Sequence, residues 1–266
     1  MPLPYRLLIE PNMVYTEGLT EWQLMDEMTD FKSTHDIPWT VIYRKMEGGR
    51  GCTPLLPHEA DKIKAMLDLR NSGQTLHFER IGFCADTISL CPSDARTAYG
   101  GVTDVFDRID LRLRQLMQIG RACELHMQAY LMQEIGRNRE LTRLLFPNVQ
   151  ITWIGNEVYC GAGKQCIDIL VFSQNEYNNF VHLLEIKSGI AGQETATQLN
   201  RYIKWLKAHI PEISVHQIIP TVVARGTADQ LHGELQNFLR GHGITQYREV
   251  TFDSELRFAV VVHRVR

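Results

Sequence analysis

The sequence lacks the segments that direct a chain into or across a membrane. No run approaches the roughly 18 consecutive apolar residues of a membrane span. The opening residues, Met-Pro-Leu-Pro-Tyr-Arg, lack the charged-then-apolar order of a secretory signal. The six cysteines form no Cys-x-x-Cys pair, and several stand in apolar surroundings. These absences predict reduced thiols in a cytoplasmic protein that does not bind a membrane.

Several catalytic and binding signatures are missing as well. The sequence has no Gly-x-Ser-x-Gly elbow of a serine hydrolase. It has no His-x-x-x-His or Cys-His zinc spacing, and its ten histidines do not cluster. The glycine loop at 48–51 lacks the Lys-Ser/Thr ending of a P-loop. The formal net charge of −3 gives no support to a globally basic nucleic-acid binder, so such a contact needs a local patch.

What is present is a chain of 266 residues, 44% apolar, which is enough for one large or two small domains. Small and polar residues at 93–102 predict a linker. We therefore expect an N-terminal α+β domain over 1–103, for substrate recognition or dimerisation, and a second domain over 104–266. In the first domain the sequence pattern predicts strands at 5–9, 39–43 and 75–83 and helices at 19–28 and 58–69.

The second domain shows an α/β pattern in α+β order, with sheet strands laid down first and then covered by helices. A long helical stretch is predicted over 104–145. Strands are predicted at 150–154, 158–160, 167–172, 180–186, 215–223, 246–252 and 257–263, and helices at 195–209 and 228–240.

Three charged residues stand inside otherwise apolar strands: Asp168, Glu185 and Lys187. A buried carboxylate costs several kcal/mol unless it is paired or bound to a metal. Alternate side chains of a strand share a face, so Glu185 and Lys187 point the same way, and strand pairing would bring Asp168 to them. Two carboxylates and a backbone carbonyl, that of Ile186, suit Mg²⁺. Lys187 would then orient or deprotonate a water, or neutralise a phosphate, in metal-assisted hydrolysis.

These residues resemble the PD-(D/E)XK nuclease superfamily, whose core motif is Asp…Glu-x-Lys. The similarity runs over roughly residues 115–252. Upstream, the segment around Glu124 looks like the first core helix, whose glutamate completes the metal site in this family. Downstream, Gln198-x-x-x-Tyr202 is similar to a helix of the RecB-like and NucS-like branches. The strength of the resemblance comes from the order of these elements, because strand Glu-x-Lys alone is frequent.

The resemblance implies a restriction-endonuclease-like core, with a mixed central sheet flanked by helices. It further implies an endonuclease of repair, defence or restriction type that hydrolyses DNA with Mg²⁺, for which Mn²⁺ can substitute. Glu134 is the alternative to Glu124, since both share the face of Met127 and Leu131. Gln198 and Tyr202 would contact phosphate or a metal-bound water; the alternative for them is ordinary packing.

Phosphate contacts are expected from local cations on two segments. They are Arg44, Lys45, Arg50, Arg201 and Lys204. Trp39 and Tyr43, on the predicted strand before the glycine loop, would stack on bases. Val41 shares their strand parity, however, and this favours the alternative of a packed strand followed by a basic turn.

Other functions remain open at this stage. One is a ribonuclease or a nucleotide-activated effector, and another is a catalytically silent binding module. A homodimer would supply two active sites for the two strands of DNA.

Overall fold

The computed structural model describes most of the chain beyond residue 108 and parts of the chain before it. The described residues are 13–15, 17–27, 37–42, 54–75, 81–84, 89–92, 109–160, 165–210, 213 and 216–266. Arg44, Lys45 and Arg50 lie outside them, as do the predicted strand at 5–9, the glycine loop and the predicted linker at 93–102. The phosphate contacts of these three cations and the domain boundary at residue 103 stay predictions.

Two compact units make up the chain, residues 1–31 with 60–105, and residues 32–59 with 106–266. The predicted helices of the N-terminal part are present as α1 (Glu21–Glu27) and α3 (Pro57–Arg70). Helix α3 starts with proline and an acidic first turn, which suits the free N–H groups and positive dipole end of a helix. Strands β1 (Ile81–Cys84) and β2 (Ser89–Pro92) form an antiparallel pair in the first unit.

Residues 39–42 form a helical turn, so the predicted strand at these positions is wrong. Pro38 fixes a backbone angle suited to the start of a helix, and its carbonyl accepts a hydrogen bond from Val41 N–H (3.1 Å). Trp39 packs against the core of the second unit, with its ring centroid 5.1 Å from that of His209. Trp39 is therefore partly buried against this core, and its stacking on bases stays a prediction.

The second unit is built on a mixed six-stranded sheet with strand order β10-β9-β7-β5-β4-β3. Strands β3, β4 and β5 run antiparallel, β5, β7 and β9 run parallel, and β10 returns antiparallel to β9. Their bounds are β3 Gln150–Tyr159, β4 Cys166–Gln174, β5 Asn179–Ile186, β7 His216–Ala224, β9 Gln246–Phe252 and β10 Phe258–Arg264. The short strands β6 (Ile190–Ala191) and β8 (Gly226–Thr227) pair beside it. The predicted mixed central sheet is confirmed.

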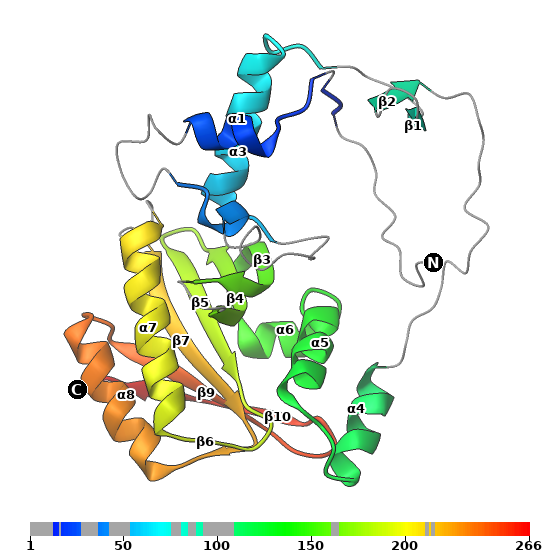
Figure 1. Cartoon of the computed structure of the whole chain (residues 1–266). Coiled ribbons are helices and arrows are strands. Elements are labelled where there is room, and N and C mark those ends of the chain that lie inside the picture. The colour runs from blue at the N-terminus through cyan, green and yellow to red at the C-terminus, as the bar shows by residue number, and fades with distance from the viewer. Residues whose placement is uncertain are drawn as a thin grey trace. The chain divides into compact units, whose positions relative to one another are not determined.

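Helices cover both faces of this sheet (Figure 1). Helices α7 and α8 lie side by side on one face, and α4, α5 and α6 gather at the other. Their bounds are α4 Ile109–Gln118, α5 Glu124–Glu134, α6 Arg139–Leu145, α7 Gln193–His209 and α8 Asp229–Gly241. The helical stretch predicted over 104–145 is in fact broken after α4 and after α5. Gly120 (φ 68°) and Gly136 (φ 90°) stand at the breaks in the left-handed conformation that ends helices.

Strand β5 is buried on both of its faces. Leu183 belongs to the apolar cluster under α7 and α8, and its neighbour Leu184 belongs to the cluster under α4 to α6. Burial of each such side chain contributes about 1.5–3 kcal/mol. Alternation carries Glu185 to the face of Leu183, so the fold itself forces this carboxylate into the interior. No helix among the described residues combines the length and apolar character that a membrane crossing requires.

Candidate active site

Asp168 and Glu185 lie opposite each other on neighbouring antiparallel strands. The register pairs Ile169 with Leu184, and one further step of that register brings the two acids together. The Asp168 carboxylate accepts a hydrogen bond from Ile186 N–H, with 2.7 Å between Oδ2 and N. The strand pairing expected from the sequence is therefore present, and both acids face the α7 side of the sheet.

Lys187 follows β5 directly and joins the two strand acids to a helix acid. Its Nζ donates to Glu185 Oε1 at 2.7 Å and lies 3.7 Å from Glu124 Oε1. The exposed fraction of the side chain is 2% for Glu185, 15% for Lys187 and 48% for Glu124, so the site opens to solvent on the α5 side. Glu134 is the last residue of α5, and its charge helps to raise the pKa of Tyr130 on the same helix. Of the two candidate helix acids, Glu124 is the one beside Lys187.

One oxygen of this cluster is unsatisfied. Glu185 Oε2 is buried and has no hydrogen-bond partner among the described residues. A buried polar atom without a partner costs about 1–3 kcal/mol, and a charged one costs more. Carboxylate oxygens from Asp168, Glu185 and Glu124, with the backbone carbonyl of Ile186, are the hard donors that Mg²⁺ takes. The donor set and the orphaned oxygen fit a divalent cation at this position.

The two strand acids, Asp168 and Glu185, resist ionisation when no metal is bound. Burial raises the pKa of Asp168 to about 6. Burial, reinforced by the charge of Asp168, raises the pKa of Glu185 to about 7. For Lys187, burial lowers the pKa, but the charge of Glu185 and their hydrogen bond outweigh burial and the net shift is upward. The lysine therefore stays protonated, and the negative charges of Glu185 and Asp168 both stabilise its ammonium.

The stability of the metal-free protein is expected to fall as pH rises from about 5 to 8. The pKa values of Asp168 and Glu185, about 6 and about 7, lie above the ordinary 3.8 and 4.5, so the folded state holds these protons more tightly than the unfolded state. Their stabilising contribution is complete below the unfolded values and is lost as pH passes the folded ones. We expect a loss of roughly 2–4 kcal/mol in the free energy of unfolding.

Urea unfolding in EDTA at pH 5 and pH 8 measures this loss. The doubly substituted Asp168→Asn, Glu185→Gln protein removes both titrating groups and should show a flatter pH dependence than the unsubstituted protein. Equal pH dependence in the two proteins would show that these carboxyls are not the groups responsible.

Helix α7 carries the remaining predicted site residues. Tyr202 is buried, and burial together with the charge of Glu185 raises the pKa of its phenol. Gln198 lies one turn earlier and is half-buried. Arg201 and Lys204 are exposed, and the Arg201 guanidinium lies 5.7 Å from the centre of the Tyr202 ring. Tyr202 thus belongs electrostatically to the acid cluster, while the two cations lie on the outer surface of the helix.

Two residues near the acids, Gln128 and Glu157, are not among the site residues predicted from the sequence. Gln128 is buried, and its amide nitrogen donates to the carbonyl of Asp168 at 2.7 Å. It stands one helical turn after Glu124, so helical spacing was the signal that would have found it. Glu157 in β3 has φ 48°, an unusual conformation for a residue other than glycine, and its charge helps to raise the pKa of Asp168. No sequence pattern marks it.

Two histidines also come together, against the prediction that the histidines do not cluster. The Nε2 atoms of His232 and His263 lie 3.9 and 2.9 Å from Glu249 Oε2. They are far apart in the sequence, and only the pairing of β9 with β10 beneath α8 joins them.

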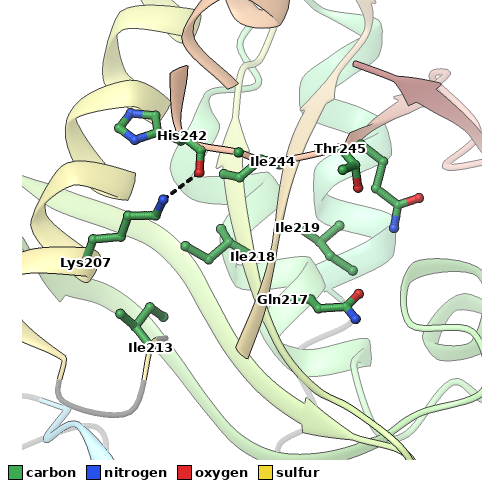
Figure 2. A pocket seen from close by; sticks show the side chains of 10 residues that line it. Lys207, Ile213, Gln217, Ile218, Ile219, His242, Ile244 and Thr245 are labelled. Atoms are coloured by element: carbon green, nitrogen blue, oxygen red, sulfur yellow. Dashed lines mark hydrogen bonds between the residues drawn. The ribbon is translucent and has the colours of Figure 1, made fainter. Parts of the chain in front are cut away.

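A pocket of about 650 Å³ lies elsewhere, between the end of α7 and the start of β7 (Figure 2). Its wall is formed by Ile213, Ile218 and Ile244, with Lys207 at the side. Figure 2 shows the Lys207 ammonium pointing to the carbonyl of His242, to which it donates at 2.6 Å. The pocket contains none of the acids of the candidate active site.

The order of elements is the one that the resemblance implied. Glu124 lies on α5, Asp168 on β4, Glu185 on β5 and Tyr202 on α7, followed by β7, α8 and β9. The mixed sheet with helices on both faces is the architecture that the resemblance implied.

Comparison with solved structures gives distant similarities. A repair endonuclease from Pyrococcus abyssi is 18% identical with a TM-score of 0.33, covering 47% of this chain and 46% of that one. EndoMS in complex with dsDNA is 16% identical with a TM-score of 0.31, covering 46% of this chain and 43% of that one. The restriction endonuclease FokI is 12% identical with a TM-score of 0.31, and the similarity covers 87% of this chain and 42% of FokI. The similarity spans under half of each of these proteins. No family model and no curated protein matches the sequence.

Proposed function

We propose that this protein is a magnesium-dependent endonuclease that hydrolyses phosphodiester bonds of DNA. The observation that carries the proposal is the buried Glu185–Lys187 ion pair beside Asp168, with one Glu185 oxygen left without a partner. A purely structural ion pair would satisfy its own polar atoms, because an unsatisfied buried oxygen lowers stability. An orphaned oxygen next to a second acid instead suits a cation that arrives with the substrate.

Asp168, Glu185, Glu124 and the Ile186 carbonyl would hold the cation, which when bound polarises the phosphate and lowers the pKa of water. The Ile186 N–H fixes the Asp168 carboxylate, and Gln128 fixes the backbone carbonyl of the same residue. Such support keeps ligands in place before substrate arrives, which lowers the cost of assembling the site.

Lys187 supplies the positive charge of the reaction site. Its ammonium is held by Glu185 and faces the open, Glu124 side of the cluster. From there it can hold the attacking water by a hydrogen bond and offset the negative charge that develops on the phosphate. Tyr202 and Gln198, on the helix that covers the cluster, are the groups that would contact the phosphate or its water.

The choice of DNA rests on the similarity of the Gln198–Tyr202 helix to the RecB-like and NucS-like branches of the family. The exposed cations Arg201 and Lys204 lie on the same helix and would meet backbone phosphates. The net charge of −3 gives no general attraction to nucleic acid, so binding would depend on such local contacts and would weaken with added salt.

The test is cleavage of labelled single-stranded, double-stranded, branched and mismatched DNA, and of RNA, with Mg²⁺, Mn²⁺ or EDTA. The double-stranded substrates include a circular DNA without ends, and metal-dependent cleavage of this circle would support the endonuclease. Cleavage of RNA alone would indicate a ribonuclease, and cleavage only after addition of a small nucleotide would indicate an effector. Binding of DNA without cleavage under any of these conditions would indicate a silent binding module.

Replacement of Glu124 by glutamine is expected to lower the cleavage rate by about 10- to 100-fold, whereas Glu134→Gln should stay within twofold of the unsubstituted protein. The physical reason is position, since only Glu124 lies near the Lys187 ammonium (3.7 Å). The two variants remove the same charge from the same helix and so control for each other. A slow Glu134→Gln enzyme beside a fast Glu124→Gln enzyme would assign the metal-site acid to Glu134.

A further inference from the structure

A second cluster of potential metal ligands lies on the same sheet and is chemically different from the acid cluster. His232 on α8, Glu249 on β9 and His263 on β10 offer one ligand atom each, and these atoms all lie within 4.8 Å of one another. The two imidazole Nε2 atoms approach the same carboxylate oxygen, Glu249 Oε2, at 3.9 and 2.9 Å. We propose that these three residues form a binding site for a zinc-class transition-metal ion.

The spacing suits direct coordination. Ligands about 2.0–2.2 Å from a tetrahedral zinc ion are roughly 3.3–3.6 Å apart. The two nitrogen–oxygen distances, 3.9 and 2.9 Å, bracket this range, and all three ligand atoms lie within 4.8 Å of one another. Side-chain rotations are therefore sufficient to bring them to coordination distance. Two imidazoles with one carboxylate favour Zn²⁺ over Mg²⁺, which prefers oxygen ligands.

The surrounding residues support the ligands in the way that metal sites require. Thr227 Oγ1 donates to Glu249 Oε1 at 2.7 Å, which leaves Oε2 facing the histidines. The hydroxyl of Tyr247 lies 2.7 Å from His232 Nδ1 and can accept a hydrogen bond from its N–H, which is the tautomer that puts a lone pair on Nε2. His232 Nε2 also lies 3.1 Å from Thr227 Oγ1, a contact that a bound ion would replace. The Tyr247 ring stacks on His263 with centroids 4.7 Å apart and fixes the plane of that imidazole. Hydrogen bonds and packing of this kind orient ligands before the metal binds.

This site is separate from the candidate active site. Glu185 pairs with Val222, and Val222 pairs with Glu249, so the two glutamates are two strands apart on one face. Two strand spacings amount to about 10 Å, which is too far for one ion to be shared. The three side chains are 13–29% exposed, which leaves a fourth coordination position for water. An ion here would tie edge strand β10 and helix α8 to β9, independently of nuclease activity.

Calorimetric titration of the metal-stripped full chain with Zn²⁺, together with its melting temperature with and without Zn²⁺, tests this inference. We expect one equivalent to bind with a dissociation constant of about 1 μM or below and to raise the melting temperature by roughly 5 °C. His232→Gln and His263→Gln should each weaken binding at least about 10-fold. The Asp168→Asn, Glu185→Gln double variant should bind zinc as the unsubstituted protein does.

Cys123→Ser is the matched control, because Cys123 Sγ and His126 Nδ1 lie 2.9 Å apart at the surface and could capture zinc. Loss of binding in this variant, or full retention in both histidine variants, would overturn the proposal. Because a histidine variant could fold poorly, the visible spectrum of the Co²⁺-loaded unsubstituted protein gives an independent reading. Bands of nitrogen and oxygen ligands alone are expected; thiolate charge-transfer bands, or no cobalt bound, would count against the site.

Discussion

The Lys187→Ala protein is expected to cleave DNA at least about 10³-fold more slowly than the unsubstituted protein, a loss of about 4 kcal/mol in transition-state stabilisation. The ammonium of Lys187 lies directly on the acid cluster, at 2.7 Å from Glu185 Oε1. In the proposed mechanism, its removal takes away both the group that would hold the water and the charge that would face the phosphate. Single-turnover cleavage of labelled DNA with Mg²⁺ measures the effect.

The fold should survive this substitution, because Lys187 lies at the end of β5 and its backbone N–H still bonds to Val223. Circular dichroism and the melting temperature check this. Lys207→Ala is the matched control, since Lys207 is an exposed lysine whose ammonium donates to the His242 carbonyl at the pocket of Figure 2, away from the acid cluster. Lys207→Ala should cleave within twofold of the unsubstituted protein. A fully active Lys187→Ala protein would remove the basis for the catalytic assignment.

The Asp168→Asn protein is expected to lose both functions of the site, with cleavage lowered at least about 10³-fold and Mg²⁺ affinity lowered at least about 10-fold. Asparagine keeps an oxygen that can accept the Ile186 N–H, so local structure is preserved while the negative charge is lost. The loss of Mg²⁺ affinity distinguishes Asp168 from Lys187. The Lys187→Ala protein should bind Mg²⁺ with an affinity within severalfold of that of the unsubstituted protein.

Calorimetric titration with Mg²⁺ and single-turnover cleavage measure the two losses together. Asp229→Asn removes an exposed carboxylate from the first turn of α8 and is the matched control for both. If Asp168→Asn bound Mg²⁺ as tightly as Asp229→Asn does, Asp168 would not be a ligand, whatever its effect on cleavage.

Much of the fold of the second unit was predictable because its signals are local. Alternation and apolar runs gave the strands that carry Asp168 and Glu185, and helical periodicity gave α7 and α8. Strand alternation also explains the position of His182, which stands three residues before Glu185 and so lies on the opposite face, where it packs against Phe146 of the α4–α6 cluster. The failures are also local in origin. Single glycines ended helices inside a stretch that was apolar enough to look continuous, and Pro38 turned a strand-like run into a helix.

The sequence by itself determined which residues carry charge into the interior, because Asp168 and Glu185 stand within apolar runs that form buried strands. Only the tertiary structure decided that Glu124 and not Glu134 lies by Lys187, that Gln128 supports Asp168, and that two histidines meet at Glu249. The physical reason is that strand and helix periodicity fix the face on which a side chain lies. Contacts between faces depend on strand order and helix packing, which join residues far apart in the chain.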